Sequence, residues 1–230
     1  MIAIIGGTSG IGLETAIYLQ ALGHEVVVGG RKDPRKASLE FRALDVTDEN
    51  QVELFFGSLR GPLEGLVYAA GTTFPKRSIT EFTTSVFDQV MQTNATGLLL
   101  CLKYGYDKLV VSRGRVVVVN SIASRNSSRY SGIEYTMSKS ALSGLVKQLA
   151  IDFAQDNVLI NSVFPSMTET PLLSENVVQS KLDEMAKTIP LGRIANPLEI
   201  SKAIAFLLLE ENTYITGSGL DINGGQFLNG

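Results

Sequence analysis

Tryptophan is absent from the 230-residue chain, and cysteine and histidine occur only once each. The lone cysteine, Cys101, cannot form an internal disulfide, which favours a reducing compartment such as the cytoplasm. The lone histidine, His24, excludes a Ser-His-Asp triad elsewhere in the chain and any multi-histidine metal site. We therefore predict a cytoplasmic protein that holds no metal.

Excess positive charge and long apolar runs are also lacking. The chain has 20 basic and 23 acidic residues and a net charge of −3, whereas nucleic-acid binding needs clustered positive charge. The longest apolar run near the C-terminus, residues 203–209, is far shorter than the roughly 20 residues that span a bilayer. The start of the chain has no basic region of the kind that opens a signal peptide. We expect neither a nucleic acid nor a membrane as partner.

An apolar run, a glycine-rich turn and a helical pattern follow one another at the start of the chain. Residues 2–5 predict a buried strand, and apolar residues recur at helical spacing in 13–22. Between them, Gly6, Gly10 and Gly12 have the spacing G-x-x-x-G-x-G. Such glycines let the backbone approach a pyrophosphate at the helix N-terminus. This order predicts a dinucleotide site, and a glycine turn without a cofactor is the alternative.

The end of the second strand, predicted at residues 25–29, bears on which dinucleotide binds. A carboxylate about twenty positions beyond the glycine loop binds the ribose 2′-hydroxyl of NAD. Here Gly30, Arg31 and Lys32 occupy that place, so no carboxylate repels a 2′-phosphate and two cations are present to receive one. We predict a preference for NADP(H) over NAD(H). A solvated loop arginine is the alternative.

The rest of the chain alternates apolar runs with helical patterns, which predicts an α/β fold with a parallel sheet. Further strands are expected at residues 41–44, 66–71, 114–121, 158–164 and 219–222, and a long helix at 83–112. Too few residues precede 41–44 for a helical crossover, so that connection should contain at most one helical turn. The polar segment at about 166–190 has the length of a substrate lid. No linker divides the chain, and we predict one domain over residues 1–230.

Two Tyr-x-x-x-Lys pairs occur, Tyr135 with Lys139 and Tyr104 with Lys108. A phenol has a pKa of about 10, and a neighbouring ammonium on the same helix face lowers it, so either pair could move protons at neutral pH. The first pair follows a strand that delivers Ser121 to the carboxyl edge of the predicted sheet, where ligands bind. The second pair lies within the preceding helix. We therefore assign the chemistry to Tyr135 and Lys139.

Taken together, these residues resemble the short-chain dehydrogenase/reductase family over essentially the whole chain. The resemblance rests on Gly6, Gly10, Gly12, Asp45-Val46, Asn94, Ser121, Tyr135, Lys139, Pro165, Thr170-Pro171, 190–193 and 215–225. The later blocks are similar to the branch that contains 3-oxoacyl-carrier-protein reductases and sugar or polyol dehydrogenases. The resemblance implies a Rossmann-type domain with a seven-stranded parallel sheet, helices on both faces, a bound NAD(P) and a homotetramer.

The same resemblance implies a role for each site residue. Tyr135 would donate a proton to a ketone or accept one from an alcohol, and Lys139 would lower its pKa and hold the nicotinamide ribose. Ser121 would bond the substrate oxygen, and Asn94 would position a water that relays protons to Lys139. Cofactor contacts are expected from Gly6, Thr8, Ser9, Gly10, Ile11, Gly12, Gly30, Arg31, Lys32, Asp45, Val46, Ala69, Ala70, Gly71, Tyr135, Lys139, Pro165, Thr168 and Thr170.

The function that these patterns favour is hydride transfer between NADP and a carbonyl or secondary alcohol, which includes an acyl-carrier-linked ketone. An NAD-linked alcohol or polyol dehydrogenase is one alternative. A dinucleotide-binding regulatory or scaffold protein without turnover is another, although such a protein has no chemical reason to keep the complete catalytic set. Four basic residues, Lys76, Arg77, Arg125 and Arg129, are expected near the substrate edge. They either recognise an anionic substrate or are solvated loop cations.

Overall fold

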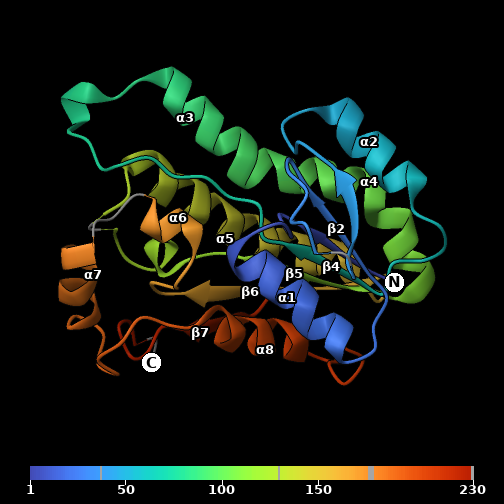
Figure 1. Ribbon diagram of the computed structural model, residues 1–230. Coiled ribbons are helices and arrows are strands. Elements are labelled where there is room, and N and C mark those ends of the chain that lie inside the picture. The colour runs from blue at the N-terminus through green and yellow to red at the C-terminus, as the bar shows by residue number, and fades with distance from the viewer. Residues whose placement is uncertain (37, 129, 176–178, 229–230) are drawn as a thin grey trace.

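Seven parallel strands form one sheet in the computed structural model, which describes residues 1–36, 38–128, 130–175 and 179–228. The strand order across the sheet is β3-β2-β1-β4-β5-β6-β7 (Figure 1). The strands are β1 (Ile2–Ile5), β2 (Val26–Gly30), β3 (Glu40–Ala43), β4 (Gly65–Tyr68), β5 (Arg115–Val119), β6 (Leu159–Pro165) and β7 (Gly219–Ile222). The predicted fold class is confirmed.

The central strands are apolar throughout because helices cover both faces of the sheet. All four residues of β1 are buried, and Ile4 of β1 pairs with Val28 of β2 on one side and Val67 of β4 on the other. A parallel sheet that is covered on both faces removes the alternation of apolar and polar residues seen in half-exposed strands. Such strands hold the carboxyl ends of β1, β4, β5 and β6 rigidly at one edge.

One face of the sheet is covered by α1 (Gly10–Ala21) and α8 (Pro197–Leu208), which lie side by side beneath the sheet in Figure 1. Leu19 and Ile204 belong to the apolar core on this side. Asn196 caps the start of α8, and its side chain accepts a hydrogen bond from the Leu198 amide. Satisfied caps of this kind fix where a helix starts.

The opposite face is covered by α2 (Glu49–Ser58), α4 (Gly97–Ser112) and α5 (Ile133–Ala154). Their buried side chains, such as Phe56, Leu98 and Leu142, form the second core cluster. The helix predicted at residues 83–112 consists of α3 (Thr84–Met91), a π-helical turn η2 (Gln92–Thr96) and α4. The π turn was not predicted, because a change of helical pitch leaves no clear mark in apolar periodicity.

Short elements and connections complete the fold. The 3-10 turns are η1 (Ile79–Glu81) and η3 (Ile122–Ser124). Between β2 and β3, no helix occurs among residues 31–36 and 38–39, as the short spacing predicted. The segment predicted as a lid contains α6 (Pro171–Ser174) and α7 (Gln179–Ala186), while its residues 176–178 lie outside the described part. Within the described residues, no helix is long and apolar enough to cross a membrane.

Candidate active site

The glycine loop between β1 and α1 is a cradle that only glycine fits. Gly6 has φ +79°, and a Cβ there would lie 2.4 Å from the amide nitrogen of Ala70. A Cβ at Gly12 would lie 2.2 Å from the Gly6 carbonyl oxygen. The loop therefore exposes backbone amides beside the N-terminus of α1, where an anion is favoured by free N–H groups and the helix dipole. This geometry fits the pyrophosphate of a dinucleotide.

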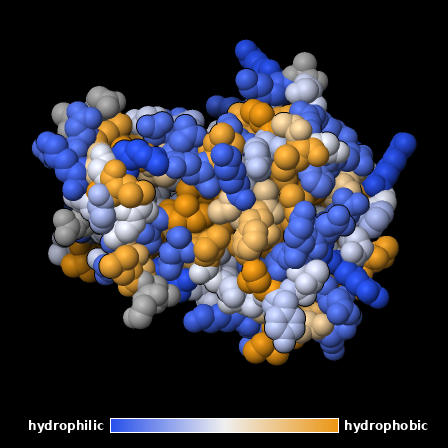
Figure 2. All heavy atoms as spheres, turned by 90° about the horizontal axis from the view of Figure 1, so that it is seen from below, coloured by the Kyte–Doolittle hydropathy of each residue, from blue (hydrophilic) through white to orange (hydrophobic). Residues whose placement is uncertain are grey.

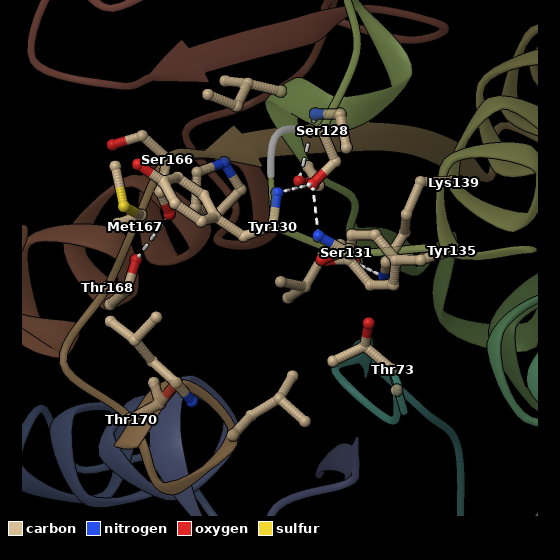
Figure 3. Close-up of a pocket in the computed structure, with 18 of the residues that line it drawn as sticks. Thr73, Ser128, Tyr130, Ser131, Tyr135, Lys139, Ser166, Met167, Thr168 and Thr170 are labelled. Carbon is tan, nitrogen blue, oxygen red and sulfur yellow. Dashed lines mark hydrogen bonds between the residues drawn. The ribbon is translucent and has the colours of Figure 1, made fainter. Parts of the chain in front are cut away.

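A cavity of about 790 Å³ opens beside this loop, at the carboxyl edge of the sheet. Of the expected cofactor contacts, the cavity is lined by Gly6, Ser9, Gly10, Ile11, Gly12, Ala69, Gly71, Tyr135, Lys139, Pro165, Thr168 and Thr170. Figure 3 shows Tyr135 and Lys139 on one side of the space and Met167, Thr168 and Thr170 on the other. The structure thus brings the glycine loop and the predicted catalytic pair to one cavity.

The remaining expected contacts lie beyond the cavity lining, toward the end of β2. A Cβ at Gly30 would lie 2.6 Å from the Thr8 Cγ2 methyl, so these two positions touch. Arg31 and Lys32 follow β2 directly and are exposed. The Asp45 carboxylate accepts from the Thr47 amide at 3.0 Å and the Thr47 hydroxyl at 2.8 Å.

Val46 and Ala70, two further expected contacts, could reach a ligand mainly through their backbone atoms. Val46 is buried and packs close to Gly97 of α4, so its side chain belongs to the core and its backbone alone is available. Ala70 meets the glycine loop through its backbone, beside Gly6. For these residues, a cofactor contact stays a prediction.

Helix α5 carries Tyr135 and Lys139 one turn apart, and the sheet fixes the lysine. Lys139 is 4% exposed, and its Nζ donates to the Val119 carbonyl oxygen at the end of β5, at 2.9 Å. The Nζ lies 5.8 Å from the centroid of the Tyr135 ring. Burial lowers the pKa of Lys139 to about 8. An ammonium in this place can stabilise a phenolate on Tyr135 only while it holds its proton.

Ser121 supplies the hydroxyl next to the tyrosine. It caps the turn η3, where its Oγ accepts from the Ala123 amide at 3.1 Å. Burial raises the pKa of the Tyr135 phenol, and a hydrogen bond with Ser121 acts in the opposite direction. The unliganded tyrosine is thereby kept in its protonated form, which is the form that donates a proton to a carbonyl oxygen.

Asn94 is fully buried in the π turn η2 and connects three segments. Its Nδ2 donates to the Thr72 carbonyl oxygen at 3.0 Å and to Ser138 Oγ at 2.9 Å, and its Oδ1 accepts from the Thr72 amide at 2.7 Å. A Cβ at Gly71 would lie 3.7 Å from Asn94 Oδ1 and 3.8 Å from Lys139 Nζ. Both groups therefore lie beside Gly71, and a relay water between them remains a prediction.

The competing pair, Tyr104 and Lys108, has structural partners away from the cavity. The Tyr104 hydroxyl donates to Glu49 Oε1 at 2.9 Å, and Lys108 Nζ donates to the Leu59 carbonyl oxygen at 2.9 Å. Both bonds join α4 to α2 and its following loop. Neither residue lines the cavity. The choice of Tyr135 over Tyr104 is consistent with this geometry.

The four basic residues expected at the substrate edge separate into different environments. Arg77 forms an ion pair with Glu134 at 3.3 Å. Arg125 pairs with Asp221 at 3.4 Å and lies 3.8 Å above the Phe164 ring. Both guanidinium groups thus have structural partners, which is a correction to the idea that all four face a substrate. Lys76 lines the cavity, and Arg129 lies outside the described residues.

Several cavity residues were not predicted from the sequence. Thr73, Ser128, Tyr130 and Ser131 line the part of the cavity next to Tyr135, and Tyr130 lies between Ser131 and Ser166 in Figure 3. Ser128 Oγ accepts from the Ser131 amide at 2.8 Å, which shapes the loop before α5. These residues sit in loops without periodicity. For Ser128, Tyr130 and Ser131, the only signal in the sequence was the group of serines close after Ser121.

Comparison with known proteins agrees with this site. The family described as enoyl-(acyl carrier protein) reductase matches residues 6–226, and the chain belongs to this family, within the short-chain dehydrogenases/reductases. The 3-oxoacyl-[acyl-carrier-protein] reductase FabG of Aquifex aeolicus is 30% identical, over 97% of this chain and 96% of its own. The cis-4-hydroxycyclohexanecarboxylate dehydrogenase of Sinomonas cyclohexanicum is 32% identical, over 96% and 94%.

Among solved structures, ElxO with NADP bound superposes with a TM-score of 0.90 and 30% identity, covering 98% of this chain and 97% of its own. These similarities make the protein an NAD(P)-dependent oxidoreductase of the short-chain type. No group of three or more His, Cys, Asp or Glu side chains arranged to hold a metal occurs within the described residues.

The burial of Lys139 leads to a prediction about how the unfolding free energy of the cofactor-free protein depends on pH. The pKa of Lys139 is about 8 in the folded protein, against an ordinary value of 10.5. Between pH 8 and 10 the unfolded chain therefore binds more protons than the folded one. The unfolding free energy consequently rises with pH in this window. We expect the unfolding free energy of wild type, relative to Lys139→Met, to increase by about 2 kcal/mol from pH 8 to 10 in urea denaturation.

The control for this measurement is Lys147→Met, because Lys147 is an exposed lysine on the same helix. The same subtraction with this variant should give no comparable rise. A flat difference for Lys139→Met would mean that its ammonium is not held in a dry environment.

Proposed function

We propose that the protein reduces a carbonyl compound, or oxidises the corresponding secondary alcohol, with NADP as the hydride carrier. The observation that carries the proposal is that Ser121, Tyr135 and Lys139 share one cavity with a glycine loop shaped for a pyrophosphate. Nicotinamide supplies or receives the hydride when the dinucleotide is bound. The substrate proposed here is a small carbonyl or alcohol compound, or a ketone carried on an acyl-carrier group as the name of the Aquifex relative suggests.

Each site residue has a task in this reaction. The Ser121 hydroxyl and the protonated Tyr135 phenol bind the carbonyl oxygen, and Tyr135 gives it a proton as the alcohol forms. Lys139 stabilises the resulting phenolate by its charge. Asn94 holds the loop after β4 against α5, so that the tyrosine, the lysine and the substrate wall keep one geometry. A regulatory protein without turnover would not need this arrangement.

Replacing Tyr135 with Phe removes the acid and leaves the ring. We expect kcat to fall by about 10²–10⁴-fold, the range that a general acid contributes, while NADPH still binds. Tyr104→Phe is the matched control and should keep kcat within about twofold, because its hydroxyl only donates to Glu49. The measurement is NADPH consumption with a panel of ketones, together with NADPH fluorescence for binding. Near-normal turnover by Tyr135→Phe would refute the assignment.

The preference for NADP rests on the residues that follow β2. Gly30 leaves no carboxylate at the ribose position, and Arg31 and Lys32 are exposed beside it. ElxO, which is 30% identical to this chain, has been solved with NADP. One feature weakens the preference, since Ser9 supplies no second basic residue in the glycine loop. The alternative function for the same site is therefore NAD-linked oxidation of an alcohol or polyol.

Cofactor selectivity can be measured as the ratio of kcat/KM for NADPH over NADH. We expect wild type to favour NADPH by at least about tenfold, because a charge-assisted hydrogen bond contributes about 1.5–3 kcal/mol. Arg31→Ala should erase most of that preference by weakening NADPH alone. Arg60→Ala, an exposed arginine in the loop after α2, is the control. A wild-type preference for NADH would overturn the proposal.

We propose a homotetramer in a reducing compartment such as the cytoplasm. A tetramer with two kinds of two-fold interface needs two apolar faces. Leu99 of α4 and Ile151 of α5 are large apolar residues exposed on one side, and Phe206 of α8 and Leu220 of β7 are exposed on another. Figure 2 shows the lower face of the molecule, where apolar residues gather in the middle within a more polar surround.

Light scattering should return about four times the 24.8 kDa of the chain at micromolar concentration. Replacing Ile151 with Lys should lower that mass by disrupting one kind of interface, whereas Leu54→Lys should leave it unchanged. Leu54 is about as exposed as Ile151, but it lies on α2, which carries none of the four apolar residues named above. A wild-type mass near 25 kDa would rule out the assembly.

A further inference from the structure

The lining of the cavity carries charge of one sign. Among the described residues that line it, the charged ones are Lys76, Lys139 and Lys181, and none is acidic. The Lys139 ammonium already donates to the Val119 carbonyl oxygen of the sheet and lies beside the Tyr135 ring. Lys76 and Lys181 are both exposed, and they come from the loop after β4 and from α7 respectively. The space next to Tyr135 is therefore bordered by two further cations.

Two acidic residues beside this space, Glu134 and Asp221, have basic partners. Glu134, which directly precedes Tyr135, is only 8% exposed at its side chain and pairs with Arg77 at 3.3 Å. Asp221 of β7 pairs with Arg125 at 3.4 Å. These two pairs neutralise the carboxylates that could otherwise compensate the lysines. Asp183 and Glu184 also lie on α7, but neither lines the cavity, so the exposed charges of the lining itself are those of Lys76 and Lys181.

The backbone around Lys76 is held in place by its neighbours. The Lys76 amide donates to the Tyr130 carbonyl oxygen at 3.2 Å, and Pro75 and Ser131 form an antiparallel bridge. Arg77 on the other side is held by the buried Glu134. The loop after β4 is thus joined to the loop before α5, and both line the cavity. The backbone at Lys76 is thus held by hydrogen bonds to the loop before α5. Lys181 lies on α7, in the segment predicted as a lid.

We propose that the substrate carries an anionic group, a carboxylate or a phosphate, which binds between Lys76 and Lys181 while its carbonyl lies at Ser121 and Tyr135. This inference rests on the proposed function and specifies its substrate class. The anion would thereby contact both the loop after β4 and helix α7. Ser128 and Tyr130 add hydroxyl groups to the same part of the lining.

The test compares matched ketones that differ in charge. With NADPH as reductant, 4-oxopentanoate is compared with its methyl ester, and dihydroxyacetone phosphate with dihydroxyacetone. We expect one anionic member of a pair to have the higher kcat/KM, by about two- to tenfold, because contacts with exposed lysines are screened by water. The pair that shows the difference identifies carboxylate or phosphate. Equal efficiency within each pair would overturn the proposal.

Three lysine variants locate the effect. Lys76→Met and Lys181→Met should each reduce the anionic-to-neutral ratio by about two- to fivefold, through KM for the ketone. Lys187→Met, an exposed lysine just after α7 that does not line the cavity, should leave the ratio unchanged. The KM for NADPH should not move in any of them. If Lys187→Met acts like the other two, or if KM for NADPH rises instead, the lysines do not recognise substrate.

A binding experiment tests the anion site independently of the proposed reaction. Calorimetry on the enzyme–NADP⁺ complex with pentanoate, compared with pentanamide, needs no turnover. Tighter binding of the carboxylate, lost in Lys76→Met, would support the anion site even if no ketone in the panel is reduced. Normal reduction of the neutral ketones without any advantage of charge would leave the proposed function standing and refute the anion site.

Discussion

The hydrogen bond from Lys139 Nζ to the Val119 carbonyl oxygen is the interaction on which the site depends. It anchors α5 to the end of the central strand β5 and so sets where Tyr135 stands relative to Ser121, which follows the same strand. A buried ammonium is costly unless it is bonded, and the low pKa of Lys139 reflects that cost. The sheet itself therefore places the lysine.

The second constraint is the π turn that holds Asn94. In an uninterrupted α-helix from Thr84 to Ser112, the side chain at this position would turn to a different direction, because each residue advances the helix by a fixed angle. The extra residue in the turn aims the Asn94 amide at Thr72 and Ser138 together. One polar side chain thereby ties the loop after β4 to the catalytic helix. Single π turns are often found at functional sites for this kind of reason.

Most of the fold was predictable from the sequence, because strands with continuous β-branched runs and helices with apolar stripes identify themselves locally. The glycine loop was predictable from its spacing, because glycine is needed where the backbone is crowded. Spacing alone did not separate Tyr135–Lys139 from Tyr104–Lys108, and the choice between them depended on the strand and Ser121 that precede Tyr135. The position of the Arg125 guanidinium was not predictable from the sequence, because its partners Asp221 and Phe164 are distant along the chain. Loop residues such as Tyr130 were missed because nothing local indicates which way a loop faces.

The contact between Gly30 and Thr8 has a consequence for how cofactor choice could change over evolutionary time. Any side chain at position 30 would meet the Thr8 methyl and hydroxyl at less than van der Waals distance. A single codon change that introduces an aspartate there would therefore displace the Thr8 side chain. In a lineage descending from this chain, the Thr8 side chain would have to shift or be replaced as part of that change. The proposed preference for NADP would in this sense be maintained by crowding at a point remote from the reacting atoms.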